Sequence, residues 1–451
     1  MAAGNPRATA VNPRATAGNQ RATILRARVL HTPRDPFSDE SALDCYENGA
    51  VAFHDGEILA TGDFTEVSGR HPDADVIDER DAFLLPGLVD THVHWPQLGV
   101  IGAMGLELLD WLRTRTLPEE VKLADLGYAR PLARDFIHGL AAIGTTTALV
   151  FGTHFPEAQD AFFEAADESG LRIASGLVVS DRDLLPELRA TAAEAHEAAL
   201  SLGRRWHGHG RLRYAVTPRF SISCSEEMLE SCGAVAAELD GSLVTSHLNE
   251  NRDEVEAVLD LFEEADDYLE TYERHGLVGP ATVMAHNVHA TDAELARMAS
   301  AGTSVAHCPS SNGFLGSGIF PMRRHLDNRV GFGLGTDVGA GTGLSVLKEG
   351  LLAYQGQMVV SDPIRLTPPH LLWLATRAGA QVLGLGDTVG DLSPGRAADM
   401  VLLRAPEGGT LAATLARVES PDHALGALIT LAREDSVAAT WVAGEPVHRR
   451  M

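Results

Sequence analysis

The sequence contains little positive charge, and lysine in particular is scarce. Its 62 Asp and Glu residues outnumber 36 Lys and Arg residues, which leaves a formal net charge of −26 at pH 7. Nucleic acids and anionic membrane surfaces are bound through a positively charged footprint. We therefore expect neither of them as a partner.

Cysteines and long apolar runs are also scarce. The four cysteines, Cys45, Cys224, Cys232 and Cys308, include no Cys-x-x-Cys pair, so we expect reduced thiols rather than a disulfide framework. No apolar run approaches the roughly 20 residues of a membrane span. The N-terminus lacks the continuous apolar segment of a signal peptide. These absences predict a soluble, cytoplasmic protein.

The two ends of the chain are expected to fold together. Residues 1–22 repeat the pattern Asn-Pro-Arg-Ala-Thr and have no apolar face, which predicts a disordered tail, either inert or a targeting arm. Residues 23–83 and 384–451 are rich in strand patterns, and Asp55-Gly56 between apolar runs predicts a hairpin. Both ends are therefore predicted to build one small β-sandwich domain.

Residues 84–383 alternate short apolar runs with amphipathic segments, and this pattern predicts the α/β class. Eight predicted strands lie at residues 85–90, 146–151, 172–178, 213–217, 243–247, 282–286, 303–307 and 330–337. Eight strand–helix units can close into a (β/α)8, or TIM, barrel. Active sites of this fold lie at the C-terminal ends of the strands, so polar residues there are the candidates for function.

These predicted strand ends are rich in metal-binding residues. His92 and His94 are two residues apart at the first strand, where extended backbone directs both side chains to one side. The fifth strand ends in His247, the sixth in His286 and the eighth in Asp337. A single histidine is more often structural, but this set suits zinc or ferrous iron and leaves a position for water.

The two lysines bear on the number of metal ions. Some barrels of this type bridge two metals with a carbamylated lysine on a central strand. Lys122 and Lys348 are the only lysines of the sequence, and neither ends a predicted barrel strand. We therefore expect one metal ion per chain, zinc or ferrous iron.

A metal site of this kind needs a proton carrier. One metal lowers the pKa of its bound water from about 16 toward 7, and a positioned group must then move a proton to the leaving group. Glu250 lies three residues past His247, near enough to share the pocket without binding the metal. The alternative is a solvated loop carboxylate, but beside a ligand set we expect a catalytic role.

The same residues carry a family resemblance. Pro86–His94, which reads Pro-Gly-Leu-Val-Asp-Thr-His-Val-His, resembles the opening metal motif of the amidohydrolase superfamily. Its extension through Trp95-Pro96-Gln97 narrows the resemblance to the guanine deaminase family. Further similar segments run in order to the end of the chain: Leu108–Leu112, Pro118–Glu120, Gly144–Thr147, Thr217–Phe220, His247–Asn251, Ala285–His286, His307–Asn312, Gly335–Gly341 and Gly390–Asp399.

The resemblance implies a metal-dependent hydrolase that converts guanine to xanthine and ammonia, acts in purine catabolism and forms a homodimer. It implies that zinc binds to His92, His94, His247 and Asp337. His286 would lie beside the metal-bound water, as a further ligand or as a hydrogen-bond donor.

The resemblance also implies roles for the residues around the metal. Glu250 would move a proton to the purine ring nitrogen as hydroxide attacks C2, and Asp337 would help to deprotonate the water and later protonate the departing ammonia. Gln97 and Arg219 would hold the polar edges of the base, because an amide both donates and accepts and a guanidinium donates to a carbonyl oxygen. Phe220 would line the pocket.

One stretch departs from the family pattern, and it keeps alternatives open. A Gly-Glu-Gln-like run is usual before Leu-Leu, but this chain has Gly105-Leu106-Glu107, which puts polar contacts of this loop in doubt. The nearest alternative is the same chemistry on another aminopurine, a pterin or an s-triazine with an amine or chloride leaving group. A non-catalytic scaffold on this fold typically loses metal ligands, whereas this chain has the full set and Glu250.

Overall fold

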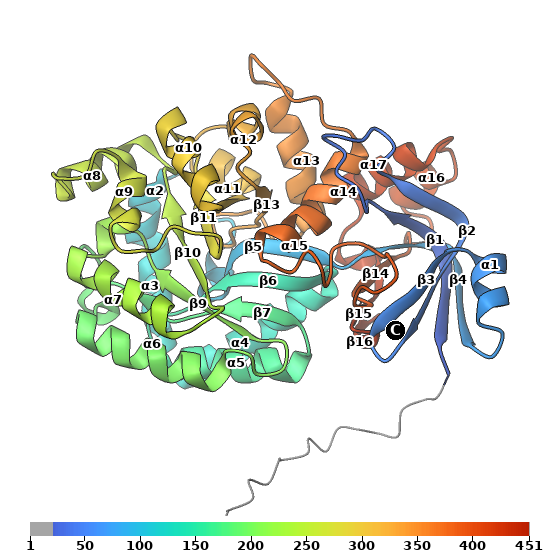
Figure 1. Ribbon diagram of the computed structural model, residues 1–451, viewed down its shortest axis with the longest axis horizontal. Helices are drawn as coiled ribbons and strands as arrows, with labels where there is room; N and C mark the ends of the chain where they lie inside the picture. The colour runs from blue at the N-terminus through green and yellow to red at the C-terminus, as the bar shows by residue number, and fades with distance from the viewer. Residues whose placement is uncertain (1–20, 451) are drawn as a thin grey trace, which may run out of the picture.

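A computed structural model gives the structure of residues 21–450, so most of the predicted tail lies outside the described residues. The described part contains a ring of parallel strands surrounded by helices and, beside it, a separate sheet built from the two ends of the chain (Figure 1). No helix in residues 21–450 has the length and apolar character needed to cross a membrane.

The predicted barrel is confirmed. Its strands pair side by side in parallel, in the order β5, β6, β7, β9, β10, β11, β12, β13, and the short β8 (Val178–Val179) pairs with β9. Hydrogen bonds between β5 and the chain at β13 complete the ring, from Thr91 Oγ1 to Leu334 O at 2.9 Å and from Asp337 N to His92 O at 2.8 Å. The strand bounds are β5 Leu88–His94, β6 Thr145–Phe151, β7 Arg172–Ser175, β9 Arg213–Pro218, β10 Leu243–Leu248, β11 Thr282–His286, β12 Ser304–His307 and β13 Phe332–Leu334.

Side chains fill the interior of the barrel below the strand ends. Buried small and aliphatic residues from successive strands, including Val89, Leu149, Ala215, Val283 and Ala306, form one apolar cluster. A (β/α)8 barrel is thus a packed core and not a pore. Only the C-terminal rim of the ring is left to accommodate a ligand.

Helices cover the outside of the ring (Figure 1). Polar caps fix where several of them begin: Thr191 with Glu194, Asn251 with Glu254, and Thr291 with Glu294 form reciprocal capping boxes at α6, α8 and α10. The larger helices that follow barrel strands are α4 Leu126–Ala142, α5 Pro156–Ser169, α6 Ala192–Trp206, α7 Glu226–Glu238, α8 Arg252–Leu261, α9 Tyr268–Glu273, α10 Asp292–Ala301, α12 Met322–Asn328 and α13 Val346–Gln357.

The two chain ends meet in one β unit, as predicted. Its seven strands form a single mixed sheet in the order β16, β15, β14, β4, β1, β2, β3, because β4 pairs with β1 on one side and with β14 on the other. The predicted hairpin lies between β2 and β3, where Asp55 and Gly56 both have positive φ. The bounds are β1 Thr23–His31, β2 Asp44–His54, β3 Glu57–Asp63, β4 Asp75–Pro86, β14 Met400–Leu403, β15 Val437–Val442 and β16 Glu445–Arg449.

Candidate active site

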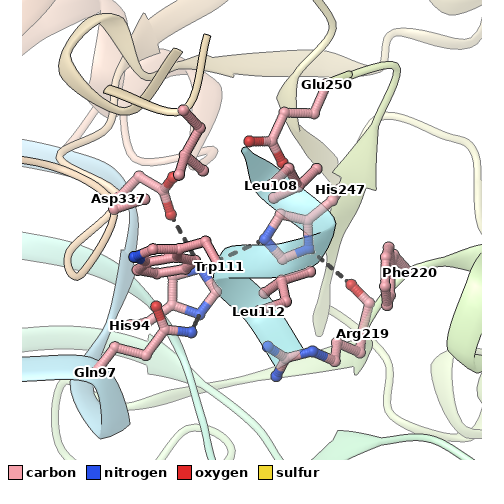
Figure 2. A pocket seen from close by; sticks show the side chains of 12 residues that line it. His94, Gln97, Leu108, Trp111, Leu112, Arg219, Phe220, His247, Glu250 and Asp337 are labelled. Carbon is pink, nitrogen blue, oxygen red and sulfur yellow. Dashed lines mark hydrogen bonds and ion pairs between the residues drawn. The ribbon is translucent and has the colours of Figure 1, made fainter. Parts of the chain in front are cut away.

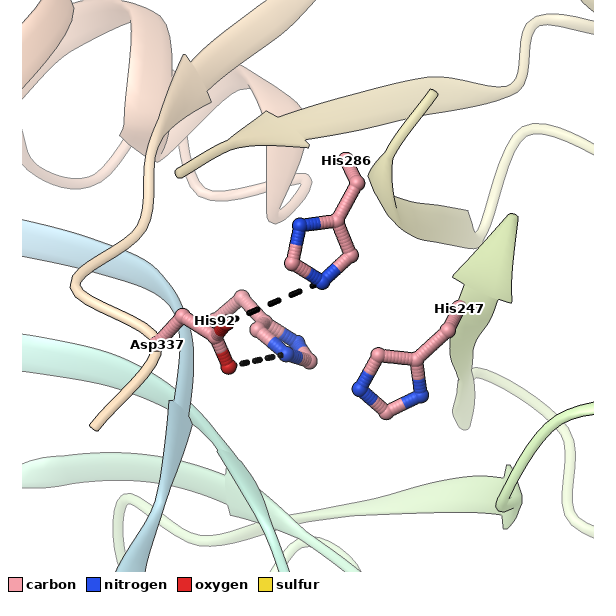
Figure 3. A group of neighbouring side chains, drawn as sticks. All are labelled: His92, His247, His286 and Asp337. Atoms are coloured by element: carbon pink, nitrogen blue, oxygen red, sulfur yellow. Dashed lines mark ion pairs between the residues drawn. The ribbon is translucent and has the colours of Figure 1, made fainter. Parts of the chain in front are cut away.

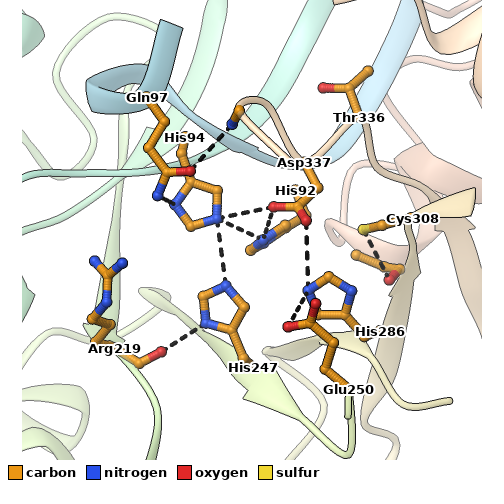
Figure 4. Close-up of polar contacts among 12 residues, drawn as sticks. His92, His94, Gln97, Arg219, His247, Glu250, His286, Cys308, Thr336 and Asp337 are labelled. Carbon is orange, nitrogen blue, oxygen red and sulfur yellow. Dashed lines mark hydrogen bonds and ion pairs between the residues drawn. The ribbon is translucent and has the colours of Figure 1, made fainter. Parts of the chain in front are cut away.

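Five potential metal ligands converge at the C-terminal rim of the barrel (Figures 3 and 4). His92 and His94 come from β5, His247 from β10, His286 from the last residue of β11, and Asp337 from the segment after β13. One ligand atom each from His92, His247, His286 and Asp337 lies within 4.8 Å of the other three. His94 belongs to the same cluster, since its Nε2 lies 3.0 Å from Nε2 of His92 and 3.4 Å from Nε2 of His247.

The spacing and protonation of these groups fit a divalent metal. Zinc binds nitrogen and oxygen at about 2.0–2.2 Å, so adjacent ligands of a tetrahedron lie roughly 3.3–3.6 Å apart. Nε2 of His92 and Nε2 of His94 lie 3.2 and 3.1 Å from Oδ1 of Asp337. Burial lowers the pKa of His94 to about 3 and holds that of His247 well below its ordinary value. Both imidazoles are therefore neutral, which is the form that binds metals.

Hydrogen bonds outside the cluster orient two of its imidazoles, and Figure 4 shows the one made by His247. Nδ1 of His247 donates to the backbone oxygen of Arg219 at 2.7 Å, and Nδ1 of His286 pairs with Oδ1 of Asn312 at 2.9 Å. An imidazole that donates through Nδ1 keeps Nε2 as a free lone pair. The Nε2 atoms of both residues are thereby directed at the centre of the cluster.

Hydrogen bonds to Asp90 hold the segment that carries Asp337. Buried Asp90 accepts hydrogen bonds from the backbone nitrogen and the hydroxyl of Thr336 at 3.0 and 2.5 Å. Burial would raise the pKa of Asp337, but hydrogen bonds with His92 and His94 outweigh it and hold this pKa well below its ordinary value. The site therefore contains an ionised carboxylate beside neutral histidines.

The backbone at the rim is unusual. Asn249, His286, Asn287 and Asp337 all have positive φ, between 47° and 70°. Residues other than glycine rarely adopt this conformation, and it is concentrated at functional sites. This conformation occurs at the ends of β10, β11 and β13, and two of the four residues, His286 and Asp337, contribute ligand atoms to the cluster.

Glu250 lies beside the cluster without belonging to it. Its side chain is buried, Oε2 lies 3.3 Å from Nε2 of His286, and Oε1 accepts from Ser317 Oγ at 3.4 Å. Burial, together with the negative charges of Glu254 and Asp337, raises the pKa of Glu250 well above its ordinary value. A carboxyl with a raised pKa next to a carboxylate with a lowered pKa can serve as an acid and a base in one pocket.

A cavity opens over the cluster (Figure 2). Its volume is about 380 Å³ including its mouth. The predicted residues Gln97, Arg219 and Phe220 all line it, together with Glu250. The rest of the wall is His94, Leu108, Trp111, Leu112, His247, Leu315, Asp337 and Ala340. Several polar groups thus face a largely apolar space, which is the usual make-up of a small-molecule site.

Comparison with known proteins identifies the family. The amidohydrolase family profile matches residues 83–447. The chain is 52% identical over 433 residues to the probable guanine deaminase of Deinococcus radiodurans, covering 95% of this chain and 99% of that protein. It is 37% identical to the guanine deaminase of Escherichia coli K12, covering 94% and 96%.

This chain belongs to the guanine deaminases of the amidohydrolase family. Solved structures agree. The E. coli guanine deaminase superimposes with a TM-score of 0.92 at 36% identity, over 95% of this chain and all of that one. A guanine deaminase from C. acetobutylicum with bound guanine in the active site has a TM-score of 0.88 at 25% identity, over the same shares. With its ligand cluster, this guanine deaminase family member is a metal-dependent amidohydrolase.

Sequence reasoning missed Glu120, which binds two of the side chains that line the cavity of this guanine deaminase family member. This buried carboxylate accepts from Gln97 Nε2 at 2.9 Å through one oxygen and from Arg219 Nη1 at 2.7 Å through the other. It lies in the short helix α3 (Leu117–Val121), far in sequence from Arg219 at the end of β9. The Pro-Glu-Glu motif was its only signal, and a motif does not say which of two adjacent glutamates points inward.

The two lysines and the loop that departs from the family pattern make their contacts outside the ligand cluster. Nζ of Lys122 donates to Glu119 Oε2 at 2.6 Å, and Nζ of Lys348 donates to Thr342 O at 3.2 Å. Leu106, at which this loop differs from the family pattern, packs into an apolar cluster with Leu108 and does not line the cavity. The change in this loop therefore alters the support of the pocket wall rather than a polar group in the pocket.

Proposed function

We propose that this chain hydrolyses the C2 amino group of guanine and releases xanthine and ammonia. The observation that carries the proposal is the juxtaposition of the histidine–aspartate cluster with Glu250 at the base of a cavity edged by Gln97 and Arg219. A metal cluster alone would serve many hydrolases. An amide and a guanidinium on the same wall suit a flat neutral base rich in donors and acceptors.

We propose zinc as the metal, one ion per chain, held by His92, His94, His247 and Asp337. Three nitrogens and one carboxylate form a ligand set typical of zinc, and ferrous iron accepts the same groups. When bound, the ion supplies activated water at neutral pH. His286 would contact this water or the ion through Nε2, which Asn312 leaves free.

Two carboxylates divide the proton transfers. Glu250 is protonated in the free pocket because its pKa is raised, so it can give its proton to the ring nitrogen next to C2. Asp337 is ionised and can take a proton from water. When the C–N bond breaks, the proton held by Asp337 goes to the departing amine, and the hydroxyl proton on C2 returns to Glu250 as the carbonyl forms. Guanine and water are thereby converted to xanthine and ammonia.

Recognition of the base would depend on one connected group of side chains. Gln97 Oε1 accepts from Gly339 N at 3.1 Å while its Nε2 donates to Glu120, so its amide is fixed in one orientation. Arg219 donates through Nη1 to Glu120, and its backbone oxygen accepts from Nδ1 of His247. The remaining donors of the guanidinium are then available to a carbonyl oxygen of the substrate.

We also propose a division into domains and a homodimer. Residues 84–383 would form the catalytic domain, and residues 23–83 with 384–451 would form the β domain. The separate sheet built from strands near the two chain ends supports this division. Exposed apolar side chains near the end of α13, namely Ile319, Tyr354, Met358 and Val359, support self-association. Sedimentation velocity would measure the oligomeric state.

The test is guanine turnover measured as ammonia release and as xanthine absorbance, before and after chelation and after reloading with zinc or ferrous iron. We expect fast turnover that chelation abolishes and metal restores. Pterins, other aminopurines and s-triazines form the comparison panel. If the metal-loaded protein were inactive on guanine but active on one of these, the substrate assignment would be wrong and the hydrolase chemistry would stand.

A further inference from the structure

Trp111 presents an unused hydrogen-bond donor in the cavity (Figure 2). It is the last residue of α2 (Leu108–Trp111), it is 2% exposed, and its side chain lines the cavity wall. Its Nε1 is buried and has no hydrogen-bond partner among residues 21–450. By contrast, the amide of Gln97 and the guanidinium of Arg219 in the same wall both have protein partners.

Two other buried indoles do have partners. Nε1 of Trp206 donates to Asp160 Oδ1 at 2.7 Å, and Nε1 of Trp95 donates to Gln159 Oε1 at 3.3 Å. Buried tryptophan N–H groups usually find an acceptor, because a buried donor without one is destabilising. The unpaired indole N–H of Trp111 therefore lies where a ligand in the cavity could supply the acceptor.

The surroundings of Trp111 suit a flat heterocycle. Its ring belongs to an apolar cluster with Val100, Leu108, Leu315 and Ala340, and three of these residues also line the cavity. Away from the reacting C2, guanine has acceptors at N7 and O6, so an edge turned toward α2 can meet the indole N–H.

We propose that Trp111 is a substrate-recognition residue whose indole N–H donates to a ring acceptor of the bound purine. This inference rests on the proposed function and adds a third polar contact to those of Gln97 and Arg219. The contact would form with substrate and transition state alike, because the acceptor edge lies away from the reacting C2. Such uniform binding affects KM rather than kcat.

The first experiment compares wild type, Trp111→Phe and Trp206→Phe in guanine kinetics and thermal unfolding. Loss of one neutral hydrogen bond should raise the KM of Trp111→Phe by about 2- to 10-fold with kcat nearly unchanged. Its melting temperature without ligand should equal or exceed that of wild type, because an unsatisfied donor is removed. Trp206→Phe breaks a formed bond to Asp160, so it should melt lower with an unchanged KM.

The second experiment identifies the acceptor. Competition would measure the affinities of 3-deazaguanine, 7-deazaguanine and 2-aminopurine, which lack N3, N7 and O6 respectively. The analogue without the acceptor should bind wild type and Trp111→Phe equally, while the other two should bind the variant more weakly. An unchanged KM for guanine, or an equal penalty on all three analogues, would overturn the role of Trp111. A wild-type protein inert toward guanine would instead overturn the proposed function beneath it.

Discussion

Glu120→Gln removes a charge that two pocket-lining side chains share. In the native chain one carboxylate oxygen accepts from Gln97 and the other from Arg219. Glutamine keeps the shape but offers one oxygen and one NH2 group. Whichever way the amide turns, one of the two partners then meets a donor instead of an acceptor.

The structure sets the size of the effect. Glu120 and Arg219 are 2% and 3% exposed, so solvent cannot replace the lost contact. A hydrogen bond to a charged group contributes about 1.5–3 kcal/mol, and each 1.4 kcal/mol corresponds to a factor of ten. If Gln97 and Arg219 hold the substrate, we expect kcat/KM to fall by roughly 10- to 100-fold. Most of the change should appear in KM, because the metal ligands are untouched.

The assay is steady-state guanine kinetics with metal content measured on the same samples. Glu119→Gln is the matched control, since the neighbouring carboxylate binds Lys122 and Tyr128 instead of the pocket residues. Glu119→Gln should keep wild-type KM, and both variants should retain their metal. Wild-type kinetics for Glu120→Gln would refute the idea that this carboxylate orients the substrate-binding side chains.

Three further predictions follow from other buried groups. Glu250→Gln should retain its metal and lose at least about 100-fold in kcat, since a positioned proton carrier contributes 10²–10⁴-fold. Asn312→Leu should reduce kcat because Nδ1 of His286 loses its acceptor, whereas Asn312→Asp keeps an oxygen there and should recover most of it. Burial raises the pKa of Glu349 to about 8, so folding favours its protonated form. That stability is fully present below about pH 4.5 and is lost as pH rises toward 8. In denaturant titrations, the free energy of unfolding of Glu349→Gln should therefore fall less between pH 5 and pH 8 than that of wild type.

Each of these predictions has a clear contrary result. Full activity of Glu250→Gln would remove this residue from the proton transfer. Equal kinetics for the two Asn312 variants would mean that the amide merely fills space. Parallel pH–stability curves for wild type and Glu349→Gln would show that Glu349 is not the group that titrates.

Local patterns were sufficient for much of the fold. The alternation of apolar runs and amphipathic segments predicted all eight barrel strands, because a buried parallel strand and a surface helix have different periods. The Asp55-Gly56 hairpin was predictable because few residues accept positive φ at both turn positions. The union of the two chain ends in one β domain was also predicted, but their pairing in a single continuous sheet instead of a sandwich was not, because the β4–β14 pairing joins residues more than three hundred positions apart.

The sequence by itself determined the chemistry available to this protein: the His-x-His pair, the later histidines and Asp337 at strand ends, and the absence of a lysine in position to bridge two metals. These features can be recognised from short stretches of sequence. Their meeting can be predicted as well, because the C-terminal ends of the strands in a parallel barrel lie at one rim. Only the tertiary structure decided how that chemistry is arranged. It paired Glu120 with both Gln97 and Arg219, set Asn312 behind His286, and left the N–H of Trp111 without a partner. Such contacts depend on side chains from distant segments packing within a few ångströms, and no spacing along the chain encodes that distance.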